Sequence, residues 1–323
     1  MSRAIVVRAL SEDLSTLALE TREVRTPGPG EVRVRLRAAS VNFPDILMVQ
    51  GKYQHKPDLP FTPGMEGAGD VVAVGDGVAG FKPGDKVIVS RLGCFSDEIV
   101  VPAQMVYLLP APFDYAQGAG FPAAYLTAYV ALVRRGQLQR DETLLVHGAA
   151  GGVGLAAVDV GKLLGAHVIA TASSAEKQAF LASYGADHVL PPSGFRDLVK
   201  ELTGGRGADV IYDPVGGDVF DESVRCIAFD GRLLVVGFTS GRIPSVSANM
   251  PLIKGFSVVG VRAGEYGRQF PEKGRENIRA IHAFASEGKL RPHVCAEFPL
   301  SETRAAMAML QERRAIGKVV VRM

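Results

Sequence analysis

A glycine-rich loop between a short apolar run and a helix-like stretch is the clearest candidate for chemistry in this chain. Residues 144–146 lead into residues 147–154, which read His-Gly-Ala-Ala-Gly-Gly-Val-Gly. Small residues let a diphosphate approach backbone amides at the positive end of the helix dipole. In the pattern A-x-G-x-x-G, the three small positions are Ala149, Gly151 and Gly154. Gly152 and Val153 lie between the last two and are also predicted to contact the cofactor. The loop predicts a dinucleotide site, and the alternative is a turn that only lets helix and strand pack closely.

The segment after the next strand indicates which dinucleotide binds. NAD sites place an acidic residue about 20 residues beyond the loop, where it bonds the ribose 2′-hydroxyl. No acid stands at the strand tip here, whereas Ser173, Ser174 and Lys177 offer two hydroxyls and a cation for a 2′-phosphate. The sequence therefore predicts NADPH in preference to NADH. Alternatively, Ser173 or Ser174 is a helix N-cap and Lys177 an exposed helix residue, which is compatible with phosphate binding.

Alternating strand-like and helix-like runs must position this loop. Short apolar, β-branched runs of this kind are typical of strands buried on both faces of a parallel sheet. The candidate strands are 144–146, 167–170, 208–212, 232–236 and 257–260, and the candidate crossover helices are 155–164, 175–183, 195–202 and 220–227. Helical stretches 275–285 and 302–313 and a closing strand 318–322 follow. The sequence predicts a series of βαβ units after about residue 114.

The first hundred residues have a different pattern. Residues 31–36 alternate between polar and apolar side chains, as a strand with one buried face does. Seven glycines between residues 64 and 84 stand among further strand-like runs. This density of turns predicts tightly turning antiparallel strands, as in a small barrel.

Length, charge and cysteine usage limit the class of protein. A chain of 323 residues usually forms more than one domain. A net charge of +2 without a long basic run argues against nucleic acid as a partner, and no apolar run is long enough to cross a membrane. The scattered cysteines, Cys94, Cys226 and Cys295, exclude a disulfide framework and a clustered zinc site. We expect a soluble cytoplasmic protein that acts on a small molecule.

Taken together, the ordered motifs resemble the medium-chain dehydrogenase/reductase superfamily, in its zinc-independent quinone oxidoreductase (zeta-crystallin-like) branch. The resemblance rests on residues 41–45, 63–69, 83–87, 149–154, 213–217 and 317–320. It implies an α/β protein with a discontinuous GroES-like β-barrel domain, residues 1–121 and 262–323. A Rossmann domain with a doubly wound parallel sheet, residues 122–261, would interrupt it, and the active site would lie in the cleft between the two domains.

The resemblance also bears on metal chemistry. Zinc-dependent relatives carry a cysteine where this chain has Asn42, and a histidine where it has Met65. Neither an amide nor a thioether is a usual zinc ligand. We therefore expect no metal, Asp45 and Glu66 in structural roles, and hydride transfer from NADPH to a conjugated acceptor whose reduction needs little proton management.

Several further site residues follow from the resemblance. Asn42 would orient the nicotinamide or the acceptor, and Tyr53 would bond the acceptor carbonyl. Alternatively, Asn42 satisfies loop backbone and Tyr53 is an exposed turn aromatic. Further cofactor contacts are expected at Thr127, Gly216, Gly237, Phe238 and Lys318. Thr127 and Phe238 could instead be packing residues, and Lys318 could reach a cofactor phosphate or pair with an acid as a surface lysine.

Three functions remain open at this point. The first is NADPH-dependent reduction of quinones. The second is reduction of the carbon–carbon double bond of an enone or enoyl thioester, including acyl-CoA substrates. The third is a structural or regulatory NADPH-binding protein. A homodimer is expected, with residues 253–261 as its candidate interface unless they form an interior strand.

Overall fold

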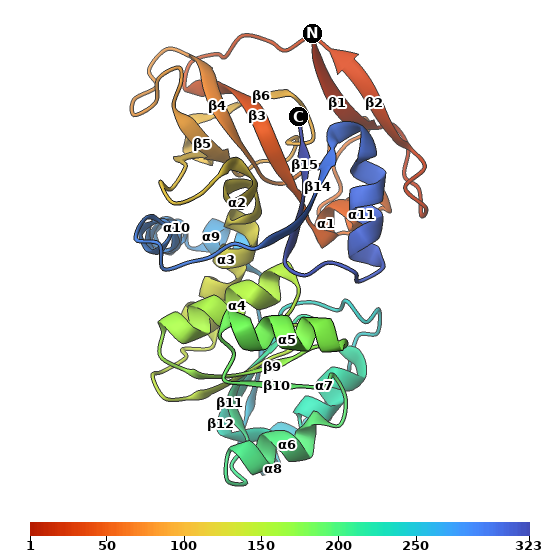
Figure 1. Cartoon of the computed structure of the whole chain (residues 1–323), viewed down its shortest axis with the longest axis vertical. Coiled ribbons are helices and arrows are strands. Elements are labelled where there is room, and N and C mark those ends of the chain that lie inside the picture. The colour runs from red at the N-terminus through yellow and green to blue at the C-terminus, as the bar shows by residue number, and fades with distance from the viewer. The chain divides into compact units, whose positions relative to one another are not determined.

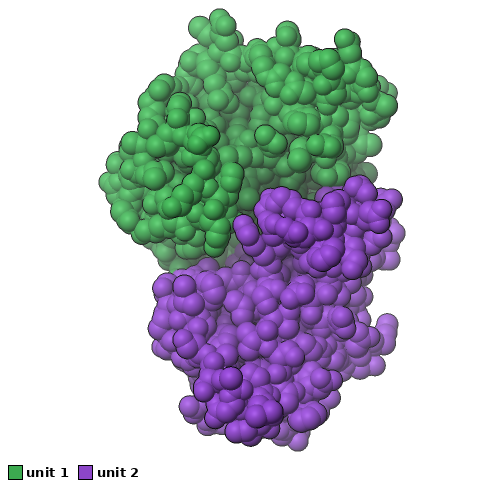
Figure 2. Space-filling view, turned by 180° about the vertical axis from the view of Figure 1, so that it is seen from behind, with its two compact units in different colours: residues 1–123, 292–323 green, residues 124–291 purple.

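The computed structural model describes all residues 1–323, which form two compact units (Figures 1 and 2). Unit 1 comprises residues 1–123 and 292–323, and unit 2 comprises residues 124–291. The sequence places the boundaries at 121/122 and 261/262, so residues 262–291 lie in unit 2 and not with the first domain as expected. The physical reason is that this segment packs on unit 2, where Arg134 bonds both Asn277 and Glu276.

Unit 1 is built around a seven-stranded sheet that is mostly antiparallel. Its strands are β3 (Glu31–Val41), β4 (Gly67–Val74), β5 (Lys86–Val89), β6 (Glu98–Pro102), β7 (Val106–Leu108), β14 (Val294–Pro299) and β15 (Lys318–Arg322). The order is β14-β15-β3-β4-β5-β7, and β6 also pairs with β3. Val32, Val34 and Leu36 on β3 are buried in the core, as their alternation predicts. The last strand of the chain thus completes the sheet begun near residue 31.

The remaining elements of unit 1 cover this sheet. A hairpin pairs β1 (Ser2–Val7) with β2 (Leu17–Arg22). The helices are α1 (Phe43–Val49), α2 (Tyr115–Gly120) and α11 (Thr303–Gln311), with single 3₁₀ turns at η1 (Ala103–Met105) and η3 (Leu300–Glu302). Helix α2 packs on β3 and β4, and α11 packs on β14 and β15.

Unit 2 contains a six-stranded parallel sheet in the order β10-β9-β8-β11-β12-β13. Its strands are β8 (Thr143–Val146), β9 (His167–Thr171), β10 (His188–Leu190), β11 (Ala208–Asp213), β12 (Ile227–Val235) and β13 (Ser257–Gly260). In chain order this is 3-2-1-4-5-6, the doubly wound arrangement of a Rossmann sheet. The expected fold class is therefore confirmed.

Helices cover both faces of this sheet (Figure 1). Helices α4 (Gly152–Leu163) and α5 (Ala175–Tyr184) lie on one face, and α6 (Phe195–Leu202), α7 (Gly217–Ser223) and α8 (Asn249–Lys254) lie on the other. Helix α3 (Pro122–Tyr129) continues as the π-helix η2 (Val130–Arg135), and α9 (Ala263–Gln269) and α10 (Pro271–Ser286) close the unit. No helix of the chain combines the length and apolarity needed to span a bilayer.

Two strands differ from the sequence prediction. Strand β10 is not predicted, because only three residues pair before two prolines follow. Strand β12 begins at Ile227, within the stretch 220–227 expected to be helical, and α7 ends at Ser223. Its register with β11 jumps from Ile227 to Arg232, and Asp230 in this irregularity has a φ of 60°.

Candidate active site

The loops after β8 and β11 meet at the point where the strand order reverses. Strands β8 and β11 are neighbours, although β9 and β10 lie between them in the chain. The backbone N–H of His147 donates to the Tyr212 carbonyl at 3.0 Å, and the N–H of Ala149 donates to the Thr171 carbonyl at 3.1 Å. Ligands of open α/β sheets bind at such a switch point, outside the carboxyl ends of the strands. The predicted diphosphate loop therefore lies where the fold favours a dinucleotide.

The glycines of this loop serve two different purposes. A Cβ atom on Gly154 would lie 2.5 Å from the Gly148 carbonyl oxygen and 2.7 Å from the Ala149 Cα, so Gly154 allows the helix to pack on the loop. A Cβ atom on Gly151 would meet nothing closer than 3.4 Å. Gly151 is also the N-cap of α4, and no side chain caps that helix. The loop thus leaves the first-turn amides of Gly152, Val153 and Gly154 uncapped, which fits a diphosphate.

His147, at the end of β8, is a structural residue. The imidazole is fully buried, with Nδ1 3.1 Å from Thr171 Oγ1 and Nε2 2.8 Å from Ser223 Oγ. Ser223 donates its hydroxyl hydrogen to the Val219 carbonyl at 2.7 Å, so Nε2 carries the proton and Nδ1 accepts from Thr171. Burial lowers the pKa of His147 to about 3. This neutral side chain ties the loop to β9 and α7.

The loop after β11 brings three of the predicted cofactor residues together. The Asp213 carboxylate accepts from the N–H of Val215 at 2.8 Å and of Gly216 at 2.9 Å. A Cβ atom on Gly216 would lie 2.9 Å from the Phe238 ring, and one on Gly237 would lie 3.2 Å from the Pro214 carbonyl oxygen. Phe238 is 39% exposed and is therefore not a core residue.

The residues predicted to select the cofactor lie at the start of α5. Ser173 and Ser174 are exposed, and Lys177 is partly exposed. Ser174 is the N-cap of α5, and its hydroxyl accepts from the Lys177 backbone N–H at 3.3 Å. The cap is thus present, and it leaves the Lys177 side chain on the first turn of the helix.

Thr127 lies in α3, partly exposed, two residues after Tyr125. The Tyr125 hydroxyl donates to buried Asp159 on α4 at 2.6 Å. Asp159 also accepts from the Arg291 backbone N–H at 3.0 Å, and burial raises its pKa. This network fixes α3 against α4 and so fixes the backbone that carries Thr127.

In unit 1, Asn42 belongs to a buried polar cluster with Glu66 and Lys318. The Lys318 ammonium lies 2.6 Å from Asn42 Oδ1 and 3.1 Å from Glu66 Oε1, and Asn42 Nδ2 donates to Glu66 Oε1 at 2.9 Å. Glu66 Oε2 accepts from the Ala123 backbone N–H at 2.7 Å. Of the predicted alternatives for Lys318, pairing with an acid is the one observed, but the side chain is only 8% exposed and is not at the surface.

Two further groups border this cluster. Asp45 is fully buried and accepts from the backbone N–H groups of Asn42 at 2.9 Å and Gly64 at 3.1 Å. Burial raises the pKa of Asp45 to about 7. Cys94 is also fully buried, and its thiol pKa is raised by burial, which makes it an unreactive core residue.

Tyr53 is partly buried and packs against the apolar core of unit 1, as does Met65. This position differs from the exposed turn aromatic that was the alternative. No group of three or more His, Cys, Asp or Glu side chains is arranged to hold a metal ion. The donors at residues 42 and 65 are an amide oxygen already bonded by an ammonium and a thioether packed on the core.

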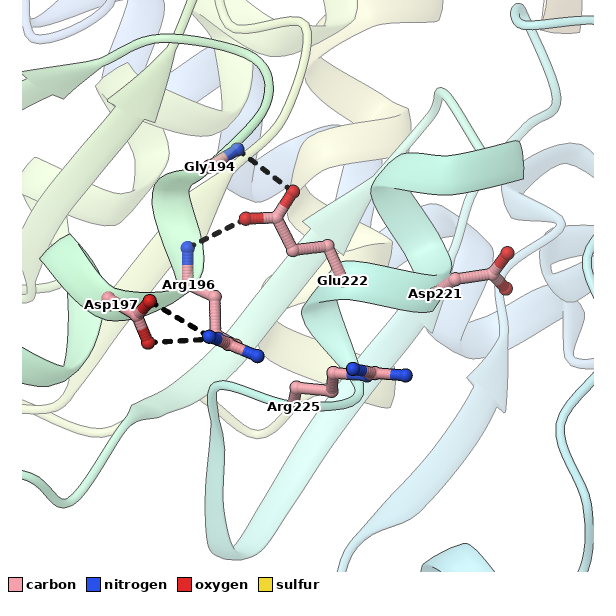
Figure 3. A pocket seen from close by; sticks show the side chains of 6 residues that line it. All are labelled: Gly194, Arg196, Asp197, Asp221, Glu222 and Arg225. Atoms are coloured by element: carbon pink, nitrogen blue, oxygen red, sulfur yellow. Dashed lines mark hydrogen bonds and ion pairs between the residues drawn. The ribbon is translucent and has the colours of Figure 1, made fainter.

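A separate surface hollow of about 300 Å³ lies between α6 and α7 (Figure 3). It is lined by Gly194, Arg196, Asp197, Asp221, Glu222 and Arg225. Glu222 accepts from the backbone N–H groups of Gly194 and Arg196, and Arg196 pairs with Asp197. Asp221 pairs with Arg242 outside the hollow, and the hollow includes none of the predicted site residues.

Comparisons with known proteins agree with this architecture. Residues 28–111 match the family described as alcohol dehydrogenase GroES-like domain, and residues 152–281 match the family described as zinc-binding dehydrogenase. The quinone oxidoreductase-like protein 2 homolog of Nematostella vectensis is 39% identical over 300 residues, which cover 91% of this chain and 82% of the relative. The chain belongs to the medium-chain dehydrogenase/reductase superfamily.

Two solved structures of this superfamily are similar over the whole chain. The Escherichia coli quinone oxidoreductase complexed with NADPH is 29% identical, covers 100% of both chains and has a TM-score of 0.89. The CurK enoyl reductase is 27% identical, covers 100% of this chain and 99% of its own, and has a TM-score of 0.90. Within the medium-chain dehydrogenase/reductase superfamily, the chain is an oxidoreductase of the quinone oxidoreductase-like branch.

Glu66 and Asp45 are the residues whose surroundings the sequence does not reveal. Glu66 stands 24 residues from Asn42 and 252 from Lys318, and no local spacing relates the three. The one sequence signal near Glu66 is the motif at residues 63–69, which contains it but does not indicate its partners.

Proposed function

We propose that the protein is an NADPH-dependent reductase of quinones that transfers hydride without a metal. The observation that carries the proposal is the uncapped glycine loop at the switch point of the unit 2 sheet, followed by a strand end with two serines and a lysine instead of an acid. NADPH would supply the hydride when bound. The resemblance to a quinone oxidoreductase crystallised with NADPH supports the same choice of cofactor.

Most of the predicted residues have a direct role in this proposal. The amides of Gly152, Val153 and Gly154 would bind the diphosphate beside Gly151, and Ser173, Ser174 and Lys177 would bind the 2′-phosphate. Gly216, Gly237 and Phe238 would border the cofactor at the end of β11 and β12. Thr127 and Asn42 would orient the nicotinamide end, and Tyr53 would donate a hydrogen bond to the acceptor carbonyl. The reduced quinone is a stabilised phenolate, so its proton can come from water.

A comparison of acceptors tests this function. Stopped-flow oxidation of NADPH is measured with benzoquinone, a simple enone and an enoyl-CoA, and metal content is measured on the same preparation. Fast oxidation with benzoquinone alone supports the proposal. Preference for the enone or enoyl-CoA would replace it with double-bond reduction, which the similarity to an enoyl reductase also favours. Binding of NADPH without oxidation by any acceptor would favour a structural or regulatory role.

The variant Tyr53→Phe tests the acceptor site. We expect turnover with benzoquinone to fall about tenfold, because a hydroxyl donor to the reacting carbonyl is lost. Tyr266→Phe in α9 is the matched control. Unaltered turnover of Tyr53→Phe with every acceptor would remove its proposed role.

We also propose a cytoplasmic homodimer. Strand β13 lies at the edge of the unit 2 sheet and pairs only with β12, so it is not an interior strand of this chain. Leu252 and Ile253 just before it are 82% and 72% exposed. An open edge beside exposed apolar side chains favours pairing with a second copy. The cytoplasm is supported by the odd number and wide spacing of the cysteines, which suit a reducing compartment.

A further inference from the structure

The Asn42 side chain does not cap the helix that follows it. Asn42 is the N-cap of α1, where an asparagine oxygen usually accepts a hydrogen bond from the first turn of the helix. The Asp45 backbone N–H donates to the main-chain carbonyl of Asn42 at 3.0 Å, and no hydrogen bond to the Asn42 side chain caps the helix. Instead, Oδ1 accepts from Lys318 at 2.6 Å and Nδ2 donates to Glu66 at 2.9 Å. The amide is therefore held by the ion pair rather than by the helix that follows it.

The ion pair fixes which way the amide points. An ammonium can only donate hydrogen bonds, and a carboxylate can only accept them. Exchanging the amide oxygen and nitrogen of Asn42 would put the oxygen on Glu66 and the NH₂ on Lys318, two repulsive contacts. Asn42 is partly exposed, whereas Glu66 and Lys318 are buried. Asn42 is thus the accessible member of a cluster whose buried members set its polarity.

The packing around Lys318 maintains this arrangement. A Cβ atom on Gly120, at the end of α2, would lie 3.2 Å from Lys318 Cγ, so the glycine makes room for the lysine stem. Glu66 is held at its other oxygen by the Ala123 backbone N–H at 2.7 Å. Both charged partners of Asn42 are therefore fixed by the backbone around them.

The contacts of the Asn42 side chain determine which of its hydrogen-bonding groups remain free. One Nδ2 hydrogen goes to Glu66, and the amide nitrogen also lies 3.5 Å from the Ser40 carbonyl oxygen. Lys318 occupies one of the two lone pairs of Oδ1. The free capacity is one lone pair of Oδ1, which suits a ligand that brings an N–H. Quinones and enones have no N–H, whereas the carboxamide of nicotinamide carries an NH₂ group.

We propose that Glu66 and Lys318 are positioning residues that lock the Asn42 amide, so that Asn42 accepts a hydrogen bond from the nicotinamide carboxamide and does not bind the acceptor. The inference rests on the proposed function only in taking a nicotinamide cofactor. It assigns Lys318 to Asn42 rather than to a cofactor phosphate.

Equilibrium binding without any acceptor tests the inference. The probes are NADP⁺ and its nicotinic acid analogue, in which a carboxylate replaces the carboxamide and the pyridine substituent has no N–H. Adenosine 2′,5′-bisphosphate, which lacks the nicotinamide, reports on the rest of the cofactor site. For the wild-type protein we expect the analogue to bind at least about tenfold more weakly than NADP⁺, while Asn42→Ala binds both alike. If NADP⁺ does not bind, NAD⁺ and its nicotinic acid analogue take its place.

The double variant Glu66→Gln/Lys318→Met tests the positioning residues. Both charges are removed together, so neither Glu66 nor Lys318 is left as a buried charge without its partner. We expect this variant to lose the discrimination between the two probes and to bind adenosine 2′,5′-bisphosphate as the wild type does. Glu20→Gln/Arg8→Met, which removes an exposed ion pair of unit 1, is the matched control and should keep the discrimination.

Two results would overturn the inference. If Asn42→Ala retained the discrimination between the two probes, Asn42 would not be the residue that binds the carboxamide. A folded double variant that retained it would show that Glu66 and Lys318 do not set the Asn42 amide. If discrimination behaves as expected but no quinone is reduced, the positioning inference stands and the proposed function fails.

Discussion

Gly154 lies so close to Gly148 that a Cβ atom on it would stand 2.5 Å from the Gly148 carbonyl oxygen. At Gly151, three residues earlier, a Cβ atom would have 3.4 Å to the same oxygen. The two glycines of one loop therefore have separable roles, one in packing and one in leaving room for a ligand.

Alanine substitutions at these two positions should have different effects. Gly154→Ala should lower both the melting temperature and the affinity for NADPH, because loop and helix must move apart. Gly151→Ala should leave the melting temperature within about 2 °C of wild type, since small surface changes cost little, and should still weaken NADPH binding at least about tenfold. Thermal unfolding and NADPH fluorescence titration measure the two quantities. Gly264→Ala, an exposed helix position with open space around it, serves as the control.

The cofactor preference should depend on Lys177. Lys177→Ala should weaken NADPH binding about tenfold or more and leave NADH binding unchanged, because only NADPH has a 2′-phosphate to pair with the ammonium. The ratio of kcat/KM values for the two cofactors measures this. Lys200→Ala in α6 is the matched control. An unchanged ratio for Lys177→Ala would contradict the assignment of Lys177 to the 2′-phosphate.

The buried His147 should make stability depend on pH. Its folded pKa is about 3, against an ordinary value of 6.5, so between these pH values the unfolded chain binds a proton that the folded chain does not. Stability from this group is complete above pH 6.5 and is lost as pH falls toward 3. His147→Gln should reduce the slope of unfolding free energy against pH by about 1.4 kcal/mol per pH unit between pH 4 and 6.

Chemical denaturation at a series of pH values measures this slope. The exposed His188, changed to Gln, is the control. Burial also lowers the pKa of His282 to about 4, but His282 is present in both proteins and cancels from the difference. An identical slope in wild type and His147→Gln would contradict the assignment of a neutral, buried imidazole.

The open edge beside β13 should support the dimer. Ile253→Glu should shift the protein toward monomer, because a carboxylate would have to be buried where an apolar side chain is expected. Sedimentation velocity at several protein concentrations measures the change. Leu108→Glu, at an exposed apolar side chain of unit 1, should leave the distribution as in wild type. A wild-type protein that stays monomeric at all concentrations would remove the dimer proposal itself.

Local patterns predict the central sheet of unit 2 but not all of its edges. Strands β8, β9 and β11 and helix α6 are found where the apolar runs and helical stretches place them, because each signal lies within a few residues. The three residues of β10 carry too little periodicity to detect. The domain boundary at 291/292 depends on side-chain packing of α9 and α10 that no composition change marks.

One part of the candidate site can also be predicted from the sequence, and the other cannot. The glycine loop is recognisable because the strand, the small residues and the helix are contiguous in the sequence. The cluster of Asn42, Glu66 and Lys318 is not, because β15 must pair with β3 before the lysine can reach the other two residues. The sequence could propose Asn42 and Lys318 separately, but their contact depends on the folded sheet.

This topology also affects how the protein is made. The chain separates Lys318 from Glu66 by 252 residues, and all of unit 2 lies between them. During synthesis, unit 2 can emerge and fold while Glu66 still lacks its ammonium partner and β3 still lacks its neighbour β15. The cluster of Asn42, Glu66 and Lys318 therefore cannot form until translation has passed residue 318. Nascent chains shorter than this should bind nucleotide through unit 2 before unit 1 becomes resistant to protease.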